Sequence, residues 1–122
     1  MSDQSHVLVA DDDDNLRTTL AEQLRMEDYQ VTVVSGGEEA IEIIQKEQID
    51  VAVLDIKMPK VDGFQVLQLI RKSFPHIKTI MLTAYADMKN IQKCKELGAD
   101  DVIQKPYDLG DLFDSIRFVT KK

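Results

Sequence analysis

Residues 51–59 read VAVLDIKMP, and this stretch gives the strongest indication of fold class in the chain. Its first four residues are apolar, without the polar alternation of a half-buried strand. Such a run is typical of a strand in a parallel sheet that helices cover on both faces. Asp55 stands where the run ends, and Pro59 and Gly63 mark the turn that follows. The stretch therefore predicts a buried strand with a carboxylate at its carboxyl end.

Four further apolar runs resemble this one, at 7–10, 31–34, 79–82 and 102–103. Each of the five runs precedes a segment whose apolar residues have helical spacing, such as Leu16, Leu20 and Leu24 after the first. Strand and helix therefore alternate five times, which predicts an α/β fold with a doubly wound five-stranded parallel sheet. Ligands of such sheets bind beyond the carboxyl ends of the strands.

Length and composition restrict the class of protein further. With 122 residues, 43% of them hydrophobic and 30% charged, the chain fits one domain, 1–122, with tails at 1–5 and 120–122. No apolar run is long enough for a membrane span, and no signal peptide is recognisable. The single cysteine excludes an internal disulfide, so a cytoplasmic location is expected. The net charge of −7 disfavours direct nucleic-acid binding.

Acidic residues follow the first and third strands. Asp11 and Asp12 leave the strand at 7–10, and Asp55 leaves the strand at 51–54. We expect these three carboxylates to converge, whereas Asp13 and Asp14 are better placed to cap the helix that follows. Three neighbouring carboxylates repel one another unless a cation lies among them. Mg²⁺ favours one or two carboxylates together with water and phosphate oxygens, and Mn²⁺ is a possible substitute.

A calcium loop is an alternative reading of the same residues. Positions 1, 3, 5 and 12 of an EF-hand loop would be held by Asp11, Asp13, Asn15 and Glu22. The sixth position, where the loop requires glycine, is Leu16. The leucine stripe also continues through the supposed loop, so this reading is the weaker one.

Two further strand ends carry chemistry. Lys105 ends the fifth strand, where its ammonium can reach the carboxylates or an added phosphoryl oxygen. Pro106 is expected to hold the preceding peptide bond cis. Thr83 ends the fourth strand and offers a hydroxyl donor, and the small Ala84 leaves room for a ligand near the backbone.

Five segments in order, VLVADD, VLDIKMPKVDGF, IMLTAYAD, LGADD and QKPY, resemble the response regulator receiver domain of two-component signal transduction. The resemblance covers about Val7 to Val119 and implies a flavodoxin-like (βα)5 fold with strand order 2-1-3-4-5. It implies that Asp55 is the phosphoacceptor, that Thr83 and Lys105 hold the phosphoryl oxygens, and that Met58-Pro59 and Asp62-Gly63 shape the loop. The implied metal ligands are Asp11, Asp12, Asp55 and the main-chain carbonyl of Lys57.

The same resemblance implies a cytoplasmic signalling switch rather than a metabolic enzyme. Its phosphoryl donor would be a phosphohistidine of a sensor histidine kinase or of a histidine phosphotransfer protein in a phosphorelay. Its output would be a downstream effector domain or protein, reached through the fourth helix, fifth strand and fifth helix. The kinase or phosphotransfer partner would dock near the first helix. Phosphorylation would be Mg²⁺-dependent and would shift a conformational equilibrium.

The chain departs from the receiver pattern at Val102, where receivers often carry an aromatic residue that moves with the threonine. Beyond the acceptor and the threonine, Lys57 and Tyr85 are expected to flank the path of an attacking water, and we hypothesise that they tune phosphate lifetime. An aspartyl-phosphate hydrolase is the second candidate, but it needs an acid where Lys57 stands. A flavin-binding electron carrier is the third, but its first loop would be rich in Ser, Thr and Gly rather than DDDDN.

Overall fold

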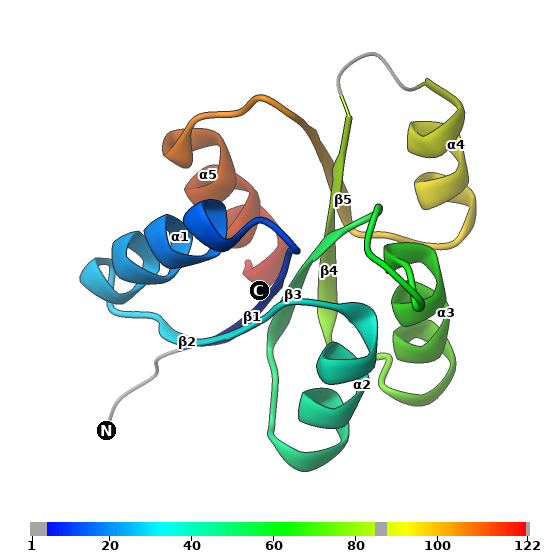
Figure 1. Cartoon of the computed structure of the whole chain (residues 1–122), viewed down its shortest axis with the longest axis horizontal. Helices are drawn as coiled ribbons and strands as arrows, with labels where there is room; N and C mark the ends of the chain where they lie inside the picture. The colour runs from blue at the N-terminus through cyan, green and yellow to red at the C-terminus, as the bar shows by residue number, and fades with distance from the viewer. Residues whose placement is uncertain (1–4, 85–87, 122) are drawn as a thin grey trace.

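A computed structural model describes residues 5–84 and 88–121, with the side chains of residues 15–17 omitted. The strands are β1 (His6–Ala10), β2 (Gln30–Val34), β3 (Val51–Asp55), β4 (Lys78–Thr83) and β5 (Asp101–Gln104). The helices are α1 (Asp14–Met26), α2 (Gly37–Lys46), α3 (Gly63–Ser73), α4 (Met88–Glu96) and α5 (Leu109–Thr120). Each predicted strand is present and extends the apolar run by one or two residues. Strands and helices alternate along the whole described chain (Figure 1).

All strands pair in parallel, and their order is β2-β1-β3-β4-β5, which confirms the predicted fold class. The register aligns the strand ends that carry chemistry. Ala10 pairs with Leu54, Leu82 with Asp55, and Thr83 with Gln104. The residues that follow β1, β3, β4 and β5 therefore meet at one edge of the sheet.

Helices cover both faces of the sheet, with α1 and α5 on one side and α2, α3 and α4 on the other (Figure 1). Alternate residues of the buried strands supply the two cores. Val7, Val9 and Val53 face α1 and α5, whereas Leu8 and Leu54 face the other three helices. Full burial of such a side chain stabilises the fold by about 1.5–3 kcal/mol. The uniformly apolar strand runs thus follow from two-sided burial, as predicted.

The helical stripes predicted from sequence are buried or partly buried where their side chains are described. Leu20 and Leu24 are fully buried, and so is Cys94 on α4. Burial raises the pKa of the Cys94 thiol to about 11, which leaves it protonated and unreactive. The final helix includes Thr120, so the predicted C-terminal tail begins one residue later. Within the described residues, no helix has the length and apolarity needed to cross a membrane.

The loop between β3 and α3 is held against the end of β3 by a glycine. A Cβ atom added at Gly63 would lie 2.4 Å from the main-chain oxygen of Asp55. The amide of Gly63 donates to the oxygen of Ile56 over 2.9 Å. Asp62 caps α3 in a reciprocal capping box with Gln65. The sequence Asp62-Gly63 therefore fixes the chain directly behind the predicted acceptor.

His6 begins β1 at the opposite edge of the sheet and is buried. Its Nδ1 lies 3.1 Å from the main-chain oxygen of Gln48, and its Nε2 lies 2.7 Å from Oγ1 of Thr32. Its main-chain amide donates to Oδ2 of Asp50 over 2.7 Å. These bonds join β1 to β2 and to the loop before β3, so His6 has a structural role that its place in the sequence did not indicate.

Candidate functional site

The three carboxylates that were predicted to converge do so at the carboxyl edge of the sheet. Asp11 and Asp12 follow β1, and Asp55 is the last residue of β3. One oxygen atom from each of the three lies within 4.8 Å of the others. Asp11 and Asp55 are buried, whereas Asp12 is exposed. The cluster is therefore accessible to solvent on the side of Asp12.

Backbone amides orient the two buried carboxylates. The amide of Asp13 donates to Oδ1 of Asp11 over 2.9 Å, and the amide of Lys57 donates to Oδ1 of Asp55 over 3.2 Å. Each bond spans two residues and closes an Asx-type turn as the chain leaves its strand. Since α1 begins at Asp14, the later positions of the supposed EF-hand loop are helical. The calcium-loop alternative is therefore wrong.

Lys105 bridges the two buried carboxylates, as its position predicted. Its Nζ lies 2.9 Å from Oδ2 of Asp55 and 3.3 Å from Oδ2 of Asp11. Lys105 directly follows β5, and its amide donates to the oxygen of Thr83 over 2.8 Å. The bond to Pro106 is cis, as expected. Three ionised carboxylates and one ammonium leave two negative charges at the site.

The protonation equilibria of the site follow from burial and this charge balance. Burial raises the pKa of Asp55 above its usual 3.8; the charge of Asp11 adds to the rise, and Lys105 opposes it. Burial alone would lower the pKa of Lys105, but its contact with Asp55 and the charges of Asp55 and Asp11 raise it above 10.5. Both groups therefore bind their proton more tightly in the site than in water, Asp55 chiefly because it is buried and Lys105 because it contacts carboxylates.

Thr83 brings a hydroxyl that is buried and finds no partner in the part of the chain that the structure describes. A buried donor left without an acceptor costs about 1–3 kcal/mol. Thr83 ends β4, as predicted, and is 1% exposed. Its hydroxyl is therefore available to a ligand oxygen at the edge of the sheet.

A cavity of about 240 Å³ lies beside the carboxylate cluster and is lined by Lys105, by Thr83 and by every member of the cluster except Asp11. Six of its lining residues were singled out from the sequence: Asp12, Asp55, Lys57, Thr83, Ala84 and Lys105. Two were not, Ile56 and Asn90. Asn90 comes from the first turn of α4 and is, among the described lining residues, the one whose side chain carries an amide. Reading only the residues directly after each strand missed it.

Other predicted residues differ in their relation to the cavity. Pro106 is exposed and does not line the cavity. Tyr85 lies outside the described residues, and the metal-binding role of the Lys57 carbonyl stays a prediction. Tyr107 has a buried hydroxyl without a partner among the described residues. Burial, with the charge of Asp11 adding to it, raises the pKa of Tyr107 to about 12, so this phenol stays neutral.

The donor set fits a hard divalent cation. Among the described residues it consists of carboxylate oxygens, without the His and Cys donors that favour zinc. The exposed Asp12 leaves room for the water ligands that Mg²⁺ usually keeps. A dication would also neutralise the two negative charges that Lys105 leaves.

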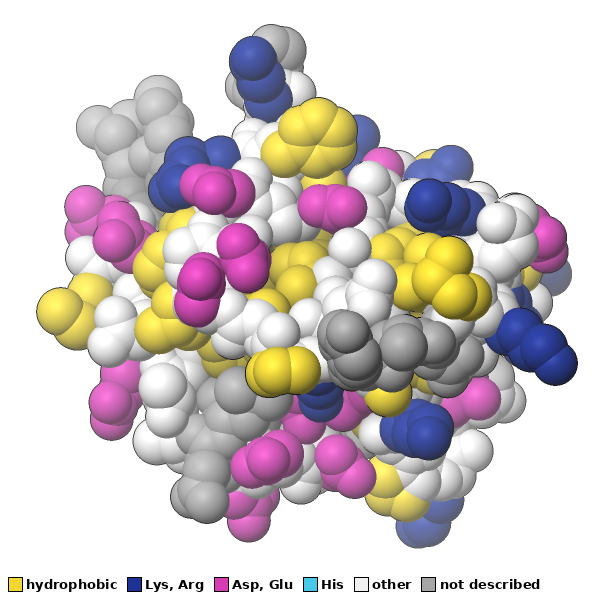
Figure 2. Space-filling model, turned by 90° about the horizontal axis from the view of Figure 1, so that it is seen from above, with side chains coloured by type: hydrophobic (Ala, Val, Ile, Leu, Met, Phe, Trp, Pro, Cys, Tyr) yellow, Lys and Arg dark blue, Asp and Glu magenta, His cyan; other side chains and the backbone are white. Residues whose placement is uncertain are grey.

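Charges are unevenly distributed over the surface beyond the carboxyl edge. Seen from above, Lys and Arg side chains are most frequent toward the top and right of the view, and acidic side chains predominate on the left (Figure 2). Helix α4 contributes Lys89, Lys93 and Lys95 against one acid, Glu96. The strongly acidic chain therefore presents a basic helix next to its acidic site.

Comparison with known proteins gives consistent matches. The family model of the response regulator receiver domain matches residues 7–117. A probable transcriptional regulator, ycf27, of Cyanidium caldarium is 40% identical over 119 residues, which are 98% of this chain and 47% of that protein. Sporulation initiation phosphotransferase F of Bacillus subtilis is 34% identical over 111 residues, 91% of this chain and 90% of that protein.

A solved structure agrees with these matches. The crystal structure of a response regulator receiver domain protein from Methanospirillum hungatei superposes with a TM-score of 0.89 at 31% identity, covering 94% of this chain and 92% of that one. The chain spans about half the length of the ycf27 proteins that it matches. The family match, the strand order and the acidic edge of the sheet agree, and the chain belongs to the response regulator receiver domain family of two-component signalling.

Proposed function

We propose that this receiver domain accepts a phosphoryl group on Asp55 in a Mg²⁺-dependent reaction and switches the conformation of its output face. The observation that carries the proposal is the meeting of Asp55, Lys105 and the unpartnered Thr83 hydroxyl around one cavity, beside Asp11 and Asp12. Phosphoryl transfer needs an aligned nucleophile and neutralised phosphoryl oxygens more than it needs proton transfer. The cavity supplies both.

The reaction is a displacement at phosphorus. A carboxylate oxygen of Asp55 attacks as the anion, so no base is required. An O–P bond forms to Asp55, and the P–N bond of the donor phosphohistidine breaks, leaving its electron pair on the imidazole nitrogen. In hydrolysis, water attacks the phosphorus, the bond to Asp55 breaks, and carboxylate, inorganic phosphate and a proton result. Asp55 is regenerated in each cycle.

The surrounding residues stabilise the negative charge on the transferring group. Lys105 lies 2.9 Å from Asp55 and can move its hydrogen bond onto a phosphoryl oxygen. The hydroxyl of Thr83 donates to a second oxygen, which satisfies the donor that is left unpartnered. Asp11, Asp12, Asp55 and the main-chain carbonyl of Lys57 would hold Mg²⁺, or Mn²⁺ in its place. The ion would supply charge neutralisation at the phosphoryl oxygens.

The domain serves as a switch rather than as a metabolic enzyme. Lys57 stands where an aspartyl-phosphate hydrolase needs a second acid, and this residue lines the cavity. We retain the hypothesis that Lys57 and Tyr85 set phosphate lifetime. Equal dephosphorylation rates for wild type, Lys57→Ala and Tyr85→Ala would contradict it.

The proposed partners follow from the family and from charge. The donor is a sensor histidine kinase or a histidine phosphotransfer protein that docks near α1. The output is an effector domain or protein in the cytoplasm, reached through α4, β5 and α5. The net charge of −7 argues against nucleic acid as a direct ligand of this domain. One relative is called a transcriptional regulator and another a phosphotransferase, so both outputs have precedent in the family.

A small-molecule donor tests the proposal without a partner. The protein is incubated with acetyl phosphate in Mg²⁺ or in excess chelator, and its intact mass is followed. We expect one acid-labile phosphoryl group per chain with Mg²⁺, none with chelator, and none for Asp55→Asn. An unmodified wild-type protein in excess Mg²⁺ and donor would refute the proposal.

A further inference from the structure

Helix α4 reaches the acceptor cavity through Asn90. This residue lies in the first turn of α4 and is partly buried. It lines the 240 Å³ cavity together with Asp55, Thr83 and Lys105. Among the described residues it is the one member of α4 that lines the cavity, and the one lining residue whose side chain carries an amide. An amide NH₂ group has two donors, and the phosphorylated acceptor would present acceptor oxygens to it.

We propose that Asn90 donates a hydrogen bond to the phosphoryl group on Asp55 and thereby couples phosphorylation directly to α4. The inference rests on the proposed function, because it requires a phosphoryl group in this cavity. It goes beyond that function by naming a further positioning residue and the element on which it acts.

Val102 stands where receivers often carry the aromatic residue that moves with the threonine, so the coupling between acceptor and α4 needs another residue here. Val102 belongs to β5, is partly buried and packs against the core beneath α2, α3 and α4. It lines a hollow of about 310 Å³ with Ile91 and Ala99, next to α4. A valine side chain cannot swing between a buried and an exposed position as a large aromatic ring can. Asn90 would connect α4 to the acceptor without an aromatic side chain at position 102.

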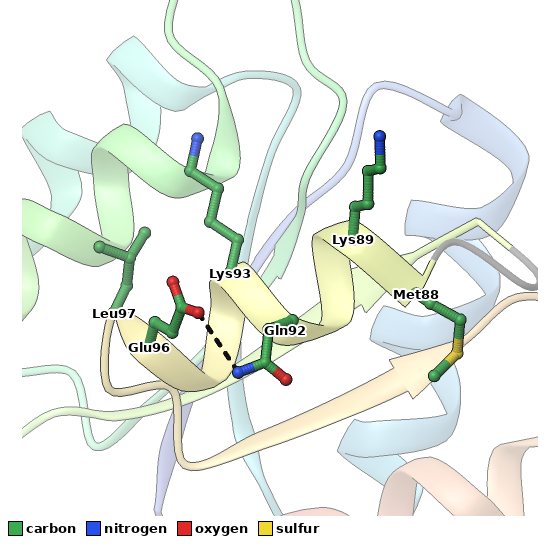
Figure 3. Close-up of a pocket in the computed structure, with 6 residues that line it drawn as sticks. All are labelled: Met88, Lys89, Gln92, Lys93, Glu96 and Leu97. Atoms are coloured by element: carbon green, nitrogen blue, oxygen red, sulfur yellow. Dashed lines mark hydrogen bonds between the residues drawn. The ribbon is translucent and has the colours of Figure 1, made fainter.

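The position of α4 suits it to respond to such a bond. Cys94 is the one fully buried residue of α4. A shallow hollow of about 550 Å³ lies on the exposed side of the helix. That hollow is lined by Met88, Lys89, Gln92, Lys93, Glu96 and Leu97 (Figure 3). Elements with few buried apolar contacts are displaced at low free-energy cost. A hydrogen bond at Asn90 would therefore move a lightly anchored helix.

Residue Gln92 provides a matched control on the same helix. It is exposed and donates to Glu96 over 3.3 Å (Figure 3). In that view Gln92 and Met88 project from one side of α4, whereas Lys89 and Lys93 project from the other. Gln92 does not line the acceptor cavity, so its truncation removes a polar α4 side chain without touching the proposed bond.

The test uses beryllofluoride with Mg²⁺ as a stable substitute for the phosphoryl group. Its dissociation constant is measured by titration, and the amide signals of α4 are followed by NMR at saturation. For Asn90→Ala we expect the affinity for beryllofluoride to fall about tenfold, because one charge-assisted hydrogen bond is lost. The chemical-shift changes of the α4 amides should also be smaller at saturation.

Asn90→Asp keeps the shape of the side chain but replaces its donors by a negative charge, so it should bind beryllofluoride more weakly still. Gln92→Ala should behave as wild type.

The outcomes separate the two proposals. If wild type fails to bind beryllofluoride, the proposed function fails. If wild type binds and both Asn90 variants match it in affinity and in α4 response, the proposed function stands and the role of Asn90 is refuted. Circular dichroism confirms that each variant is folded before titration, and Asn90→Asp provides the test should Asn90→Ala unfold.

Discussion

The ammonium of Lys105 lies 2.9 Å from Oδ2 of Asp55, although 50 positions separate the two residues in the sequence. The contact exists because parallel strands end at the same edge and because the register of β3, β4 and β5 aligns their last residues. It places a permanent cation beside the proposed nucleophile. It also leaves the site with two negative charges for a dication to neutralise.

Replacing Lys105 by alanine should slow phosphorylation while preserving metal binding. Removing one preorganised donor from a transferring group costs about 100-fold in rate. The loss of the ammonium leaves the carboxylates more negative, so Mg²⁺ affinity should rise. The phosphorylation rate with acetyl phosphate is measured by intact mass. Lys72→Ala, an exposed lysine on α3, is the charge-matched control. An unchanged rate in Lys105→Ala would show that the ion pair has no catalytic part.

Replacing Asp55 by asparagine should stabilise the metal-free protein. The pKa of Asp55 is raised in the folded state, chiefly by burial. The folded state therefore binds this proton more tightly than the unfolded chain does. Stability from this group is present below pH 3.8 and is lost as pH rises through the folded pKa. At neutral pH the free energy of unfolding should rise by about 1 kcal/mol in the variant, because the buried charge of a functional residue is removed.

Urea unfolding at neutral and acidic pH checks this prediction. The advantage of Asp55→Asn should diminish as the pH falls through the raised folded-state pKa of Asp55, and it should be smallest below pH 3.8, where Asp55 is protonated in both the folded and the unfolded state. Mg²⁺ should stabilise wild type more than the variant. A variant less stable than metal-free wild type at neutral pH would mean that the pair with Lys105 outweighs the cost of burial.

Replacing Gly63 by alanine should disrupt the acceptor loop. The added Cβ would lie 2.4 Å from the main-chain oxygen of Asp55, which is backbone and cannot move aside cheaply. Overpacking of this kind costs about 1–3 kcal/mol. Gly36→Ala is the matched control, because a Cβ there meets nothing within 4 Å and the residue is extended. Thermal unfolding compares the two, and equal losses would contradict the steric explanation.

Replacing Tyr107 by phenylalanine should raise stability. Its hydroxyl is buried without a partner among the described residues, so removing it recovers about 1 kcal/mol of desolvation cost. The pKa of Tyr107 is raised to about 12, so wild type should also lose stability between pH 10 and 12, and the variant less so. Tyr29→Phe, at a partly buried tyrosine of the same core, is the control. A destabilised Tyr107→Phe would reveal a bond made by this hydroxyl.

The sequence was sufficient for the parts of the structure that repeat a simple rule. Uniformly apolar strands followed by amphipathic helices predicted the sheet, and the residue at each strand end predicted Asp11, Asp55, Thr83 and Lys105. Both inferences work because parallel strands share an edge. The resemblance to receivers added the strand order, which the runs alone leave open.

Contacts that depend on how elements far apart in the sequence pack together were not predicted. Asn90 belongs to a helix and reaches the cavity only through the packing of α4 on β4 and β5. The place of His6 depends on Gln48 and Thr32, which are 42 and 26 positions away. The orphaned hydroxyl of Tyr107 reflects burial beside the site, which no local pattern encodes.

Chemical mapping of the phosphorylated residue tests the central claim most directly. The protein is treated with acetyl phosphate and Mg²⁺, the acyl phosphate is reduced with borohydride, and the peptides are sequenced by mass spectrometry. Reduction converts a phosphorylated aspartate to homoserine. We predict homoserine at position 55, with Asp11 and Asp12 unmodified and no homoserine in excess chelator. Homoserine at position 11 or 12, or at no position in the wild-type protein, would contradict the assignment of Asp55 as the acceptor.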